Sequence, residues 1–378
     1  MKAINKIKNN NKLVGWIAIS CVIILSIFTT FSLTTSDKHD FEIHFIDVGQ
    51  AEAALVICEG QAMLIDGGNV GDSGLLYTYL KDRNIKHLNY VIASHPHEDH
   101  IGGLAGALNY ATVDKVYCPV TSYDSVIFEN FAKYVERRDT EITVPSVGET
   151  FMLGTAEVTI LGVNVIENTN DASIILRITY GDTSFLFTGD AERAAENAVI
   201  DSGATIESTV LKVGHHGSDT STSYLFLREV MPKFAVISVG EDNEYGHPTD
   251  EVLSRLRDAG VTVYRTDIQG TIVCSSNGTD VKFEVYKNNG TDTLHKVGGV
   301  RETIETTPIA EDTVSIDTDI AETETKVVTY VLNTSSHVFH DSSCRYVKDI
   351  KEKNKKEFFG TREEAIELGY KSCGNCKP

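Results

Sequence analysis

Short apolar runs recur along residues 41–287, and turn-forming residues such as Gly, Asp and Asn separate most of them. Apolar runs bounded by turn residues predict β-strands, whereas apolar residues at helical spacing predict helices. We therefore expect strands within residues 41–48, 53–60, 62–68, 89–95, 158–162, 173–181, 183–190, 208–214, 234–240 and 271–278, and helices within residues 72–85, 192–200 and 249–259. Because the first three strands follow one another without a helix, the pattern predicts two mixed sheets covered by helices.

The amino-terminal end combines a basic segment with a long uncharged run. Residues 1–12 contain four lysines and no acid, and residues 13–33 contain no charged side chain. A helix of that length reaches about 31 Å, which is enough to cross a bilayer core. The lysines predict that residues 1–12 are cytoplasmic, that residues 13–33 form a signal anchor in the cell membrane, and that the bulk is extracellular. A cleaved signal peptide is the alternative, and it would leave the rest of the chain secreted.

Two segments near the carboxyl end depart from the sheet pattern. Residues 288–326 are acidic and rich in threonine, with few large apolar side chains, so they are expected to form a solvated linker. Residues 327–378 hold three of the seven cysteines and are expected to form a small compact module. Residues 40–287 are left as the main domain.

The charge of the chain limits the classes of partner. It has 54 acidic and 34 basic residues, for a formal net charge of −20. Such an acidic chain is a poor candidate for broad electrostatic binding to nucleic acid or anionic lipid. The few, scattered cysteines do not form a disulfide scaffold. Cys58, Cys118 and Cys274 lie in apolar strands and are expected to be ordinary buried residues.

A dense group of metal-ligating side chains directly follows an apolar strand. His95, His97, Asp99 and His100 lie within six positions, and Gly102 and Gly103 follow. Neutral imidazoles and carboxylates suit Zn, Mn or Fe. His95 and His97 occupy alternate positions of an extended segment and can face one metal, while Asp99 and His100 can turn to a second.

These residues resemble the HxHxDH signature of the metallo-β-lactamase superfamily. Other segments resemble, in order, the ComEC-like branch of that superfamily, the hydrolase domain of competence DNA-uptake proteins: residues 45–50, 64–68, 187–190, 211–218 and 245–248. The resemblance implies an α/β fold, an αββα sandwich with a two-metal site at the sheet edges. It also implies a hydrolase, here the hydrolase domain alone, anchored or secreted.

The resemblance assigns further roles. It implies that Asp190 bridges both metals, although capping of the next helix is an alternative. It implies that His215 or His216 completes the second metal while the other contacts substrate or supports a ligand, with His216 favoured as the ligand. Asp66 would orient a ligand. Asp99 would also orient the nucleophile, and His247 would contact substrate or donate a proton, unless it is a surface histidine.

The sequence departs from the wider superfamily in two places. No histidine lies between Ile101 and Asp190, where a third ligand of the first metal is usual, and the branch has Asn170, Asp171 and Ser173 near that slot. The first metal would then be held by His95, His97, Asp190 and an oxygen ligand or water, which favours Mn or mixed occupancy. Ala51 and Glu52 replace a usual Gly-Asp pair, so a carboxylate is kept but the freedom of glycine is lost.

A second donor set lies in residues 327–378. His340, Cys344, Cys373 and Cys376 are enough for a closed tetrahedral zinc site, and a domain of this size often needs one. The alternative is a disulfide between Cys373 and Cys376. The segment resembles the small metal-binding module of the Ada repair protein.

The sequence therefore predicts an extracytoplasmic hydrolase with two divalent metals, Zn or Mn, and one structural zinc. The branch resemblance implies a phosphodiester substrate, with DNA favoured. The acidic domain argues against an electrostatically adhesive nuclease. The alternatives are a hydrolase of cell-wall phosphodiesters or lactones, and an inactive surface binding protein. The sequence leaves the oligomeric state open.

Overall fold

The computed structural model of the chain describes residues 40–163, 168–294, 328–334, 338–341, 344, 346–360, 362, 365, 370–373 and 376. The chain divides into two compact units between Gly299 and Val300. The predicted anchor, residues 13–33, lies outside the described residues, as does most of the predicted linker. No helix in the described ranges is long and apolar enough to cross a membrane.

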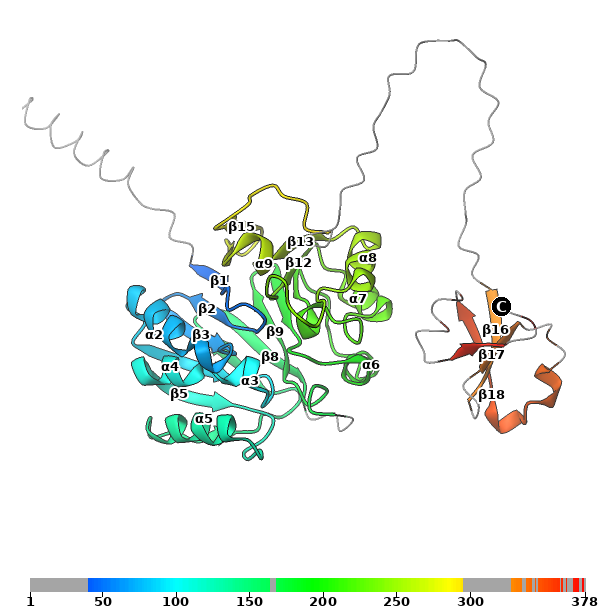
Figure 1. The fold of residues 1–378 in the computed structure, drawn as a ribbon, viewed down its shortest axis with the longest axis horizontal. Helices are drawn as coiled ribbons and strands as arrows, with labels where there is room; N and C mark the ends of the chain where they lie inside the picture. Colours follow the sequence, from blue (N-terminus) through cyan, green and yellow to red (C-terminus); the bar gives the residue numbers. More distant parts are fainter. Residues whose placement is uncertain are drawn as a thin grey trace, which may run out of the picture. The chain divides into compact units, whose positions relative to one another are not determined.

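Two mixed sheets form the centre of the first unit, which we call the hydrolase unit after the activity expected from its sequence (Figure 1). The first sheet has the order β15-β14-β1-β2-β3-β4-β5-β6. Its strands are β1 (Phe41–Phe45), β2 (Ala54–Cys58), β3 (Gln61–Ile65), β4 (His87–Ile92), β5 (Thr112–Tyr117), β6 (Ile142–Thr143), β14 (Ile272–Ser276) and β15 (Val281–Val285). The pairings from β15 to β3 are antiparallel, and those from β3 to β6 are parallel.

The second sheet has the order β13-β12-β11-β10-β9-β8-β7. Its strands are β7 (Thr150–Leu153), β8 (Ala156–Gly162), β9 (Ile175–Tyr180), β10 (Thr183–Phe187), β11 (Val210–Lys212), β12 (Phe234–Ile237) and β13 (Thr262–Arg265). Stacked rings join the two sheets, with Phe41 on Phe185 at 5.0 Å and Phe45 on Phe187 at 5.8 Å. Buried apolar side chains of both sheets therefore form one core between them.

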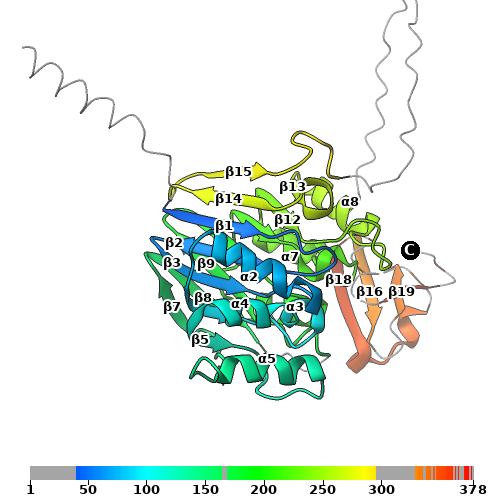
Figure 2. The same ribbon diagram turned by 60° about the vertical axis from the view of Figure 1, so that its left-hand side comes forward.

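Helices cover the outer face of each sheet, as Figure 2 shows from the side of the first sheet. On the first sheet lie η1 (Val70–Asp72), α2 (Ser73–Asp82), α3 (Glu98–Ile101), α4 (Leu104–Tyr110) and α5 (Val126–Glu136). On the second lie α6 (Arg193–Asp201), η2 (Gly214–Gly217), α7 (Tyr224–Val230), α8 (Asp250–Asp258) and α9 (Thr266–Gln269). The expected sandwich of two mixed sheets between helices is confirmed. Each sheet is buried on both faces, which explains why its strands read as continuous apolar runs.

The hydrolase unit continues beyond the boundary expected at residue 287. The Thr293 hydroxyl donates to the Val263 carbonyl at 2.6 Å, and Arg265 donates to the Thr293 carbonyl at 3.2 Å. Arg257 donates to the Leu294 carbonyl at 2.7 Å. Residues 288–294, expected in the linker, thus pack on this unit.

The second unit, which we call the C-terminal unit, contains a small sheet with the order β18-β16-β17-β19. Its elements are β16 (Val328–Asn333), β17 (Val338–Asp341), η3 (Val347–Asp349), η4 (Glu352–Asn354), β18 (Lys355–Gly360) and β19 (Lys371–Ser372). One cluster of buried apolar residues supports it: Tyr330, Leu332, Phe339 and Ala365. As far as the described residues form it, this core is small for an independent domain.

Candidate metal centre

The loops after β3 and β4 interlock at one edge of the first sheet. Asp66 adopts the left-handed region with φ 57°, and its Oδ1 accepts from the Ser94 backbone at 2.7 Å. The Gly67 backbone donates to the His100 carbonyl at 2.6 Å. A side chain on Gly103 would meet the Gly67 carbonyl oxygen at 2.0 Å, so only glycine permits this approach. The histidine-rich segment is therefore fixed by its backbone.

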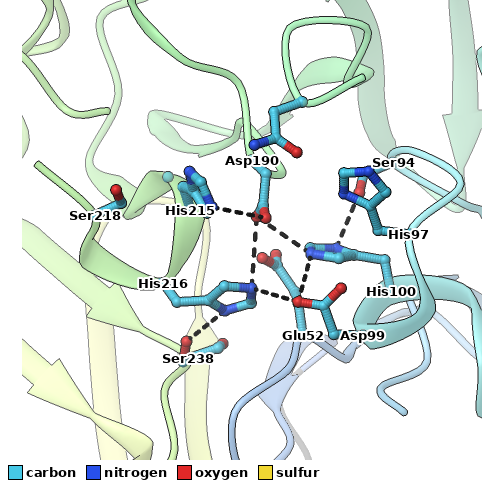
Figure 3. Close-up of polar contacts among 12 residues, drawn as sticks. Glu52, Ser94, His97, Asp99, His100, Asp190, His215, His216, Ser218 and Ser238 are labelled. Atoms are coloured by element: carbon cyan, nitrogen blue, oxygen red, sulfur yellow. Dashed lines mark hydrogen bonds and ion pairs between the residues drawn. The ribbon is translucent and has the colours of Figure 1, made fainter. Parts of the chain in front are cut away.

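Four side chains converge in front of this edge, as Figure 3 shows: Asp99, His100, Asp190 and His216. Their donor atoms all lie within 4.8 Å of one another. Nε2 of His100 lies 3.2 Å from Asp190 Oδ1, and Nε2 of His216 lies 3.6 Å from the same oxygen. His216 Nε2 is also 3.3 Å from Asp99 Oδ2. The structure thus gathers two imidazole nitrogens and two carboxylates around one point.

The buried atoms of this cluster fit a divalent metal. Nδ1 of His100 donates to Asp66 Oδ2 at 2.8 Å, and Nδ1 of His216 donates to the Ser238 carbonyl at 2.9 Å. Each Nε2 lone pair therefore faces the cluster. Among the described residues, these Nε2 atoms and Asp190 Oδ1 have no hydrogen-bond partner. Because buried polar atoms without partners are costly, their convergence favours a bound cation.

A second group of imidazoles faces the other oxygen of Asp190. Nε2 of His95 is 3.9 Å from Asp190 Oδ2, and Nε2 of His215 is 3.6 Å from it. Nδ1 of His97 lies 2.9 Å from His95 Nε2. The two oxygens of one carboxylate thus face two sets of donors, as a bridging ligand requires.

His215 and His216 face different oxygens because of an unusual turn. Their φ angles are 49° and 53°, so two successive residues other than glycine lie in the left-handed region. Each such residue costs about 1–3 kcal/mol. The His215 backbone donates to the Gly189 carbonyl at 3.0 Å, and a side chain on Gly217 would meet Pro248 at 2.6 Å. The strained turn points both imidazoles toward Asp190.

The segment 170–173 supports these donors. The Ser173 hydroxyl accepts from the Asp190 backbone at 3.2 Å. Asp171 Oδ1 accepts from the backbones of Glu192 and Ala195 at 3.0 and 3.1 Å, so Asp171 caps α6. The alternative helix-capping role of Asp190 is therefore taken by another residue.

Asn170 and Glu192 lie on the side of His215. Nδ2 of Asn170 donates to Glu192 Oε1 at 3.2 Å, and that oxygen lies 3.4 Å from His215 Nδ1. Oδ1 of Asn170 is buried and has no hydrogen-bond partner among the described residues. It is therefore available as the oxygen donor expected in this region. Glu192 can hold the His215 ring through Nδ1.

Charges in the cluster shift the protonation of its members strongly. Burial would lower the pKa of His100, but Asp190, Asp66 and Asp99 outweigh it and raise that pKa well above its usual range. The same carboxylates attract any positive charge, so a metal cation bound among them would take the place of the Nε2 proton. Burial would raise the pKa of Asp190, but His100 and other imidazoles hold it well below its usual range. Burial lowers the pKa of His95, so its ring is neutral.

His247 lies at the margin of this site. Its ring is edge-on to that of His215, with centroids 5.7 Å apart, and its Nδ1 is buried without a hydrogen-bond partner in the described chain. Burial, aided by the nearby His215, lowers the pKa of His247 to about 4. A neutral ring accepts hydrogen bonds from a substrate but is a poor proton donor at neutral pH.

Comparison with known proteins identifies the fold family. The sequence profile of the Metallo-beta-lactamase superfamily matches residues 46–241. The chain belongs to the metallo-beta-lactamase superfamily. Its hydrolase unit is similar to competence-related, ComEC-like proteins. ComE operon protein 3 of Bacillus subtilis is 28% identical over 265 residues, which cover 65% of this chain and 34% of that protein.

Two further similarities were found. Recombination protein 2 of Haemophilus influenzae is 32% identical over 270 residues, covering 69% of this chain and 32% of that protein. This chain spans about a third of the length of these relatives. Among solved structures, the metallo-beta-lactamase fold protein YhfI of Bacillus subtilis matches with a TM-score of 0.43 and 17% identity, covering 62% of this chain and 98% of that one.

A buried ion pair behind this superfamily site was not expected from the sequence. Nζ of Lys212 donates to Glu52 Oε2 at 2.8 Å, and both side chains are 1% exposed. Donor atoms of Glu52, Asp66 and His100 lie within 4.8 Å of one another. The Glu52 backbone also donates to the Asp99 carbonyl at 3.0 Å. Glu52 thus contacts the loop that carries the metal ligands. The sequence gives no sign of its pairing with Lys212, because this lysine lies within an apolar strand.

The four expected donors of the C-terminal unit also converge. Atoms of His340, Cys344, Cys373 and Cys376 lie within 4.8 Å of one another. The three cysteines form no disulfide in the described part of the unit, and His340 Nδ1 is buried there with no hydrogen-bond partner. Three thiols and one imidazole fit a closed zinc site. The resemblance to the Ada module stays a prediction. Cys58, Cys118 and Cys274 are buried in the hydrolase unit, as expected.

Proposed function

We propose that the hydrolase unit is a two-metal phosphodiesterase that acts on DNA outside the cytoplasm. The observation that carries the proposal is the carboxylate of Asp190, whose two oxygens face separate imidazole sets. One relative is named a recombination protein, and the relatives as a group are competence-related, which supports DNA as the substrate.

The first metal, Zn or Mn, would be held by His95, His97, His215 and Asp190 Oδ2, with Asn170 as the nearby oxygen donor. The second would be held by Asp99, His100, His216 and Asp190 Oδ1. Such a pair supplies Lewis acidity and a water of lowered pKa.

The chain's own residues prepare this chemistry before substrate arrives. Asp66 and the Ser238 carbonyl hold the Nδ1 protons of His100 and His216, so both Nε2 atoms stay free to ligate. The side chain of Asp99 is 33% exposed, so it can orient a nucleophilic water as well as ligate. His247 contacts substrate as a hydrogen-bond acceptor. Rigid placement of such groups is the main contribution of a protein to metal-assisted hydrolysis.

The remaining parts of the proposal concern location and the C-terminal unit. Residues 13–33 would anchor the chain in the cell membrane, with both folded units outside, or would be removed to give a secreted protein. His340, Cys344, Cys373 and Cys376 would hold one structural zinc with no open position for a reactive water. Protease added to intact cells should degrade residues 34–378, and full protection would contradict this topology.

A substrate panel tests the proposed reaction. The full chain, loaded separately with Zn and with Mn, is offered single-stranded DNA, duplex DNA, a cell-wall phosphodiester and a lactone. We expect metal-dependent cleavage of DNA, with two metals in the hydrolase unit and one in the C-terminal unit by elemental analysis. Hydrolysis of a lactone or a cell-wall polymer alone would favour those alternatives. No turnover of any substrate at full metal content would favour an inactive binding protein.

A further inference from the structure

An exposed tyrosine lies beside the imidazole of His97. Tyr123 follows β5, and its ring centroid is 6.5 Å from that of His97. The ring also packs edge-on against Phe128 of α5 at 6.3 Å, while 36% of the residue stays exposed. Such a ring offers a large contact area to a ligand at a low cost in conformational entropy.

A second exposed tyrosine lies beyond His215. The ring of Tyr245 stacks on His247 with centroids 5.8 Å apart and an angle of 27°, and His247 is in turn next to His215. Tyr245 is 67% exposed. Its loop is tied by Asn243, whose Nδ2 donates to the carbonyls of Gly240 and His247 at 2.9 and 2.6 Å. The stacked pair is therefore built on a preformed loop.

The two tyrosines flank the bridging carboxylate. Figure 3 shows His97 and His215 on either side of Asp190. Tyr123 adjoins the first imidazole, and Tyr245 is reached through His247 from the second. Rings on separate flanks do not enclose one point, as a cage for a quaternary ammonium group must. They suit a substrate with a planar group on each side of the bond to be cut.

The charged residues beside the two tyrosine rings also favour contacts with planar groups over contacts with phosphates. Glu241, Asp242 and Glu244 precede Tyr245 on an exposed loop, and Asp124 follows Tyr123. These carboxylates repel distant phosphates, so they oppose binding through a long electrostatic track. Stacking of a base on an aromatic ring is worth about 1–3 kcal/mol and needs no opposite charge.

We propose that Tyr123 and Tyr245 form base-stacking subsites for the two nucleotides that flank the scissile phosphodiester. This rests on the proposed function and adds a substrate class to it. Bases paired in a duplex are stacked on one another, so the subsites take unpaired nucleotides. Binding should also depend weakly on salt, because few phosphates are neutralised by cationic side chains.

The test compares a short single-stranded DNA with an abasic strand of the same length, using the metal-loaded full chain. For the wild type, we expect KM on the abasic strand to be higher by at least about 5–150-fold, the factor that corresponds to the loss of one of the two stacked bases. Tyr123→Ala and Tyr245→Ala should each move the ratio of the two KM values toward one. Tyr123→Phe and Tyr245→Phe should preserve the ratio, because the ring is kept. Tyr286→Ala removes an exposed tyrosine that directly follows β15 and is the matched control.

Binding provides a second readout. The affinity of the protein for the labelled base-bearing strand, measured by fluorescence anisotropy, should fall only slightly between about 50 and 200 mM salt. Equal KM values for both strands in the wild type would contradict the proposed subsites without contradicting the proposed phosphodiesterase activity. A preference for a choline phosphodiester that either alanine variant removes would also overturn them. Failure to cleave both strands at full metal content would instead contradict the proposed function itself.

Discussion

The two donor clusters of this chain differ in what surrounds them. The cluster of the hydrolase unit mixes carboxylate oxygens with imidazole nitrogens: Asp99, His100, Asp190 and His216. The cluster of the C-terminal unit is mostly sulfur: His340, Cys344, Cys373 and Cys376. Three large apolar clusters support the first, whereas the described residues around the second form one apolar cluster with four buried members.

This difference indicates opposite relations between metal and fold. In the hydrolase unit, His100 donates a hydrogen bond to Asp66 and His216 donates one to the Ser238 carbonyl, and these bonds orient the two ligands. The fold therefore positions the ligands. In the C-terminal unit, the apolar core that the described residues form is small, so metal binding itself should supply folding free energy.

The largest expected effect is on turnover in the hydrolase unit. Asp190→Ala removes the carboxylate that faces both imidazole sets, so activity should fall to background while the unit stays folded. Turnover and far-UV circular dichroism, measured on the full chain, check the two halves of this prediction. Asp182→Ala changes an exposed aspartate in the β9–β10 turn, at the opposite end of β10 from Asp190, and should behave as the wild type. Activity near the wild-type level in Asp190→Ala would place the chemistry elsewhere.

Metal removal should separate the two units. A zinc chelator, or Cys344→Ser, should abolish hydrogen-exchange protection in β16 and β17 and leave protection in the hydrolase unit largely unchanged, because binding free energies of about 10–16 kcal/mol are typical of small zinc domains. Mass spectrometry of the full chain resolves both sets of peptides. Lys353→Ala is an exposed substitution in the same unit and serves as the control. Protection that survives chelation would show that the sheet is stable without zinc.

Breaking the buried ion pair between Lys212 and Glu52 tests how much this pair contributes to the stability of the hydrolase unit. Lys212→Met leaves the Glu52 carboxylate buried without its partner and should lower the free energy of unfolding by about 3–5 kcal/mol. Urea unfolding followed by circular dichroism measures it. Replacing both partners, as Glu52→Leu with Lys212→Met, should recover much of the loss. A single variant as stable as the wild type would mean that the pair is dispensable.

The smallest effect is expected from a change behind a ligand. Asp66→Asn keeps a side chain that tolerates the left-handed backbone but removes the charge that faces His100 Nδ1. Metal affinity should fall by about 10–100-fold, as competition with a chelator will show. The protein should remain folded. An unchanged affinity for metal would mean that the charge of Asp66 does not strengthen His100 as a ligand.

Much of this site could be predicted because its ligands lie in short motifs at strand ends. His95 to His100 and Asp190 follow apolar strands, so the carboxyl ends of those strands bring them together. The roles of His215 and His216 could not be separated, because they depend on two consecutive left-handed residues that no sequence pattern indicates. The partnership of Glu52 with Lys212 was also missed, since a lysine inside an apolar strand gives no sign of its partner.

The fold could be predicted from the sequence about as completely as the site. Most strands appear where apolar runs occur, because sheets buried on both faces need continuous apolar residues. The end of the hydrolase unit was placed too early, since residues 288–294 have a polar composition and attach through Arg257, Arg265 and the hydroxyl of Thr293. Hydrogen bonds of that kind leave no hydrophobic pattern.

The position of β1 has a consequence for how the chain is made. Residues 41–45 pair on one side with β2 and on the other with residues 272–276 of β14. A nascent chain therefore carries an unfinished sheet edge until almost the whole hydrolase unit has left the ribosome. Pairings so distant in sequence slow folding and expose apolar strands to aggregation in the meantime. Folding of this unit therefore cannot be completed strand by strand during synthesis, because β1 gains its second partner, β14, only near the end.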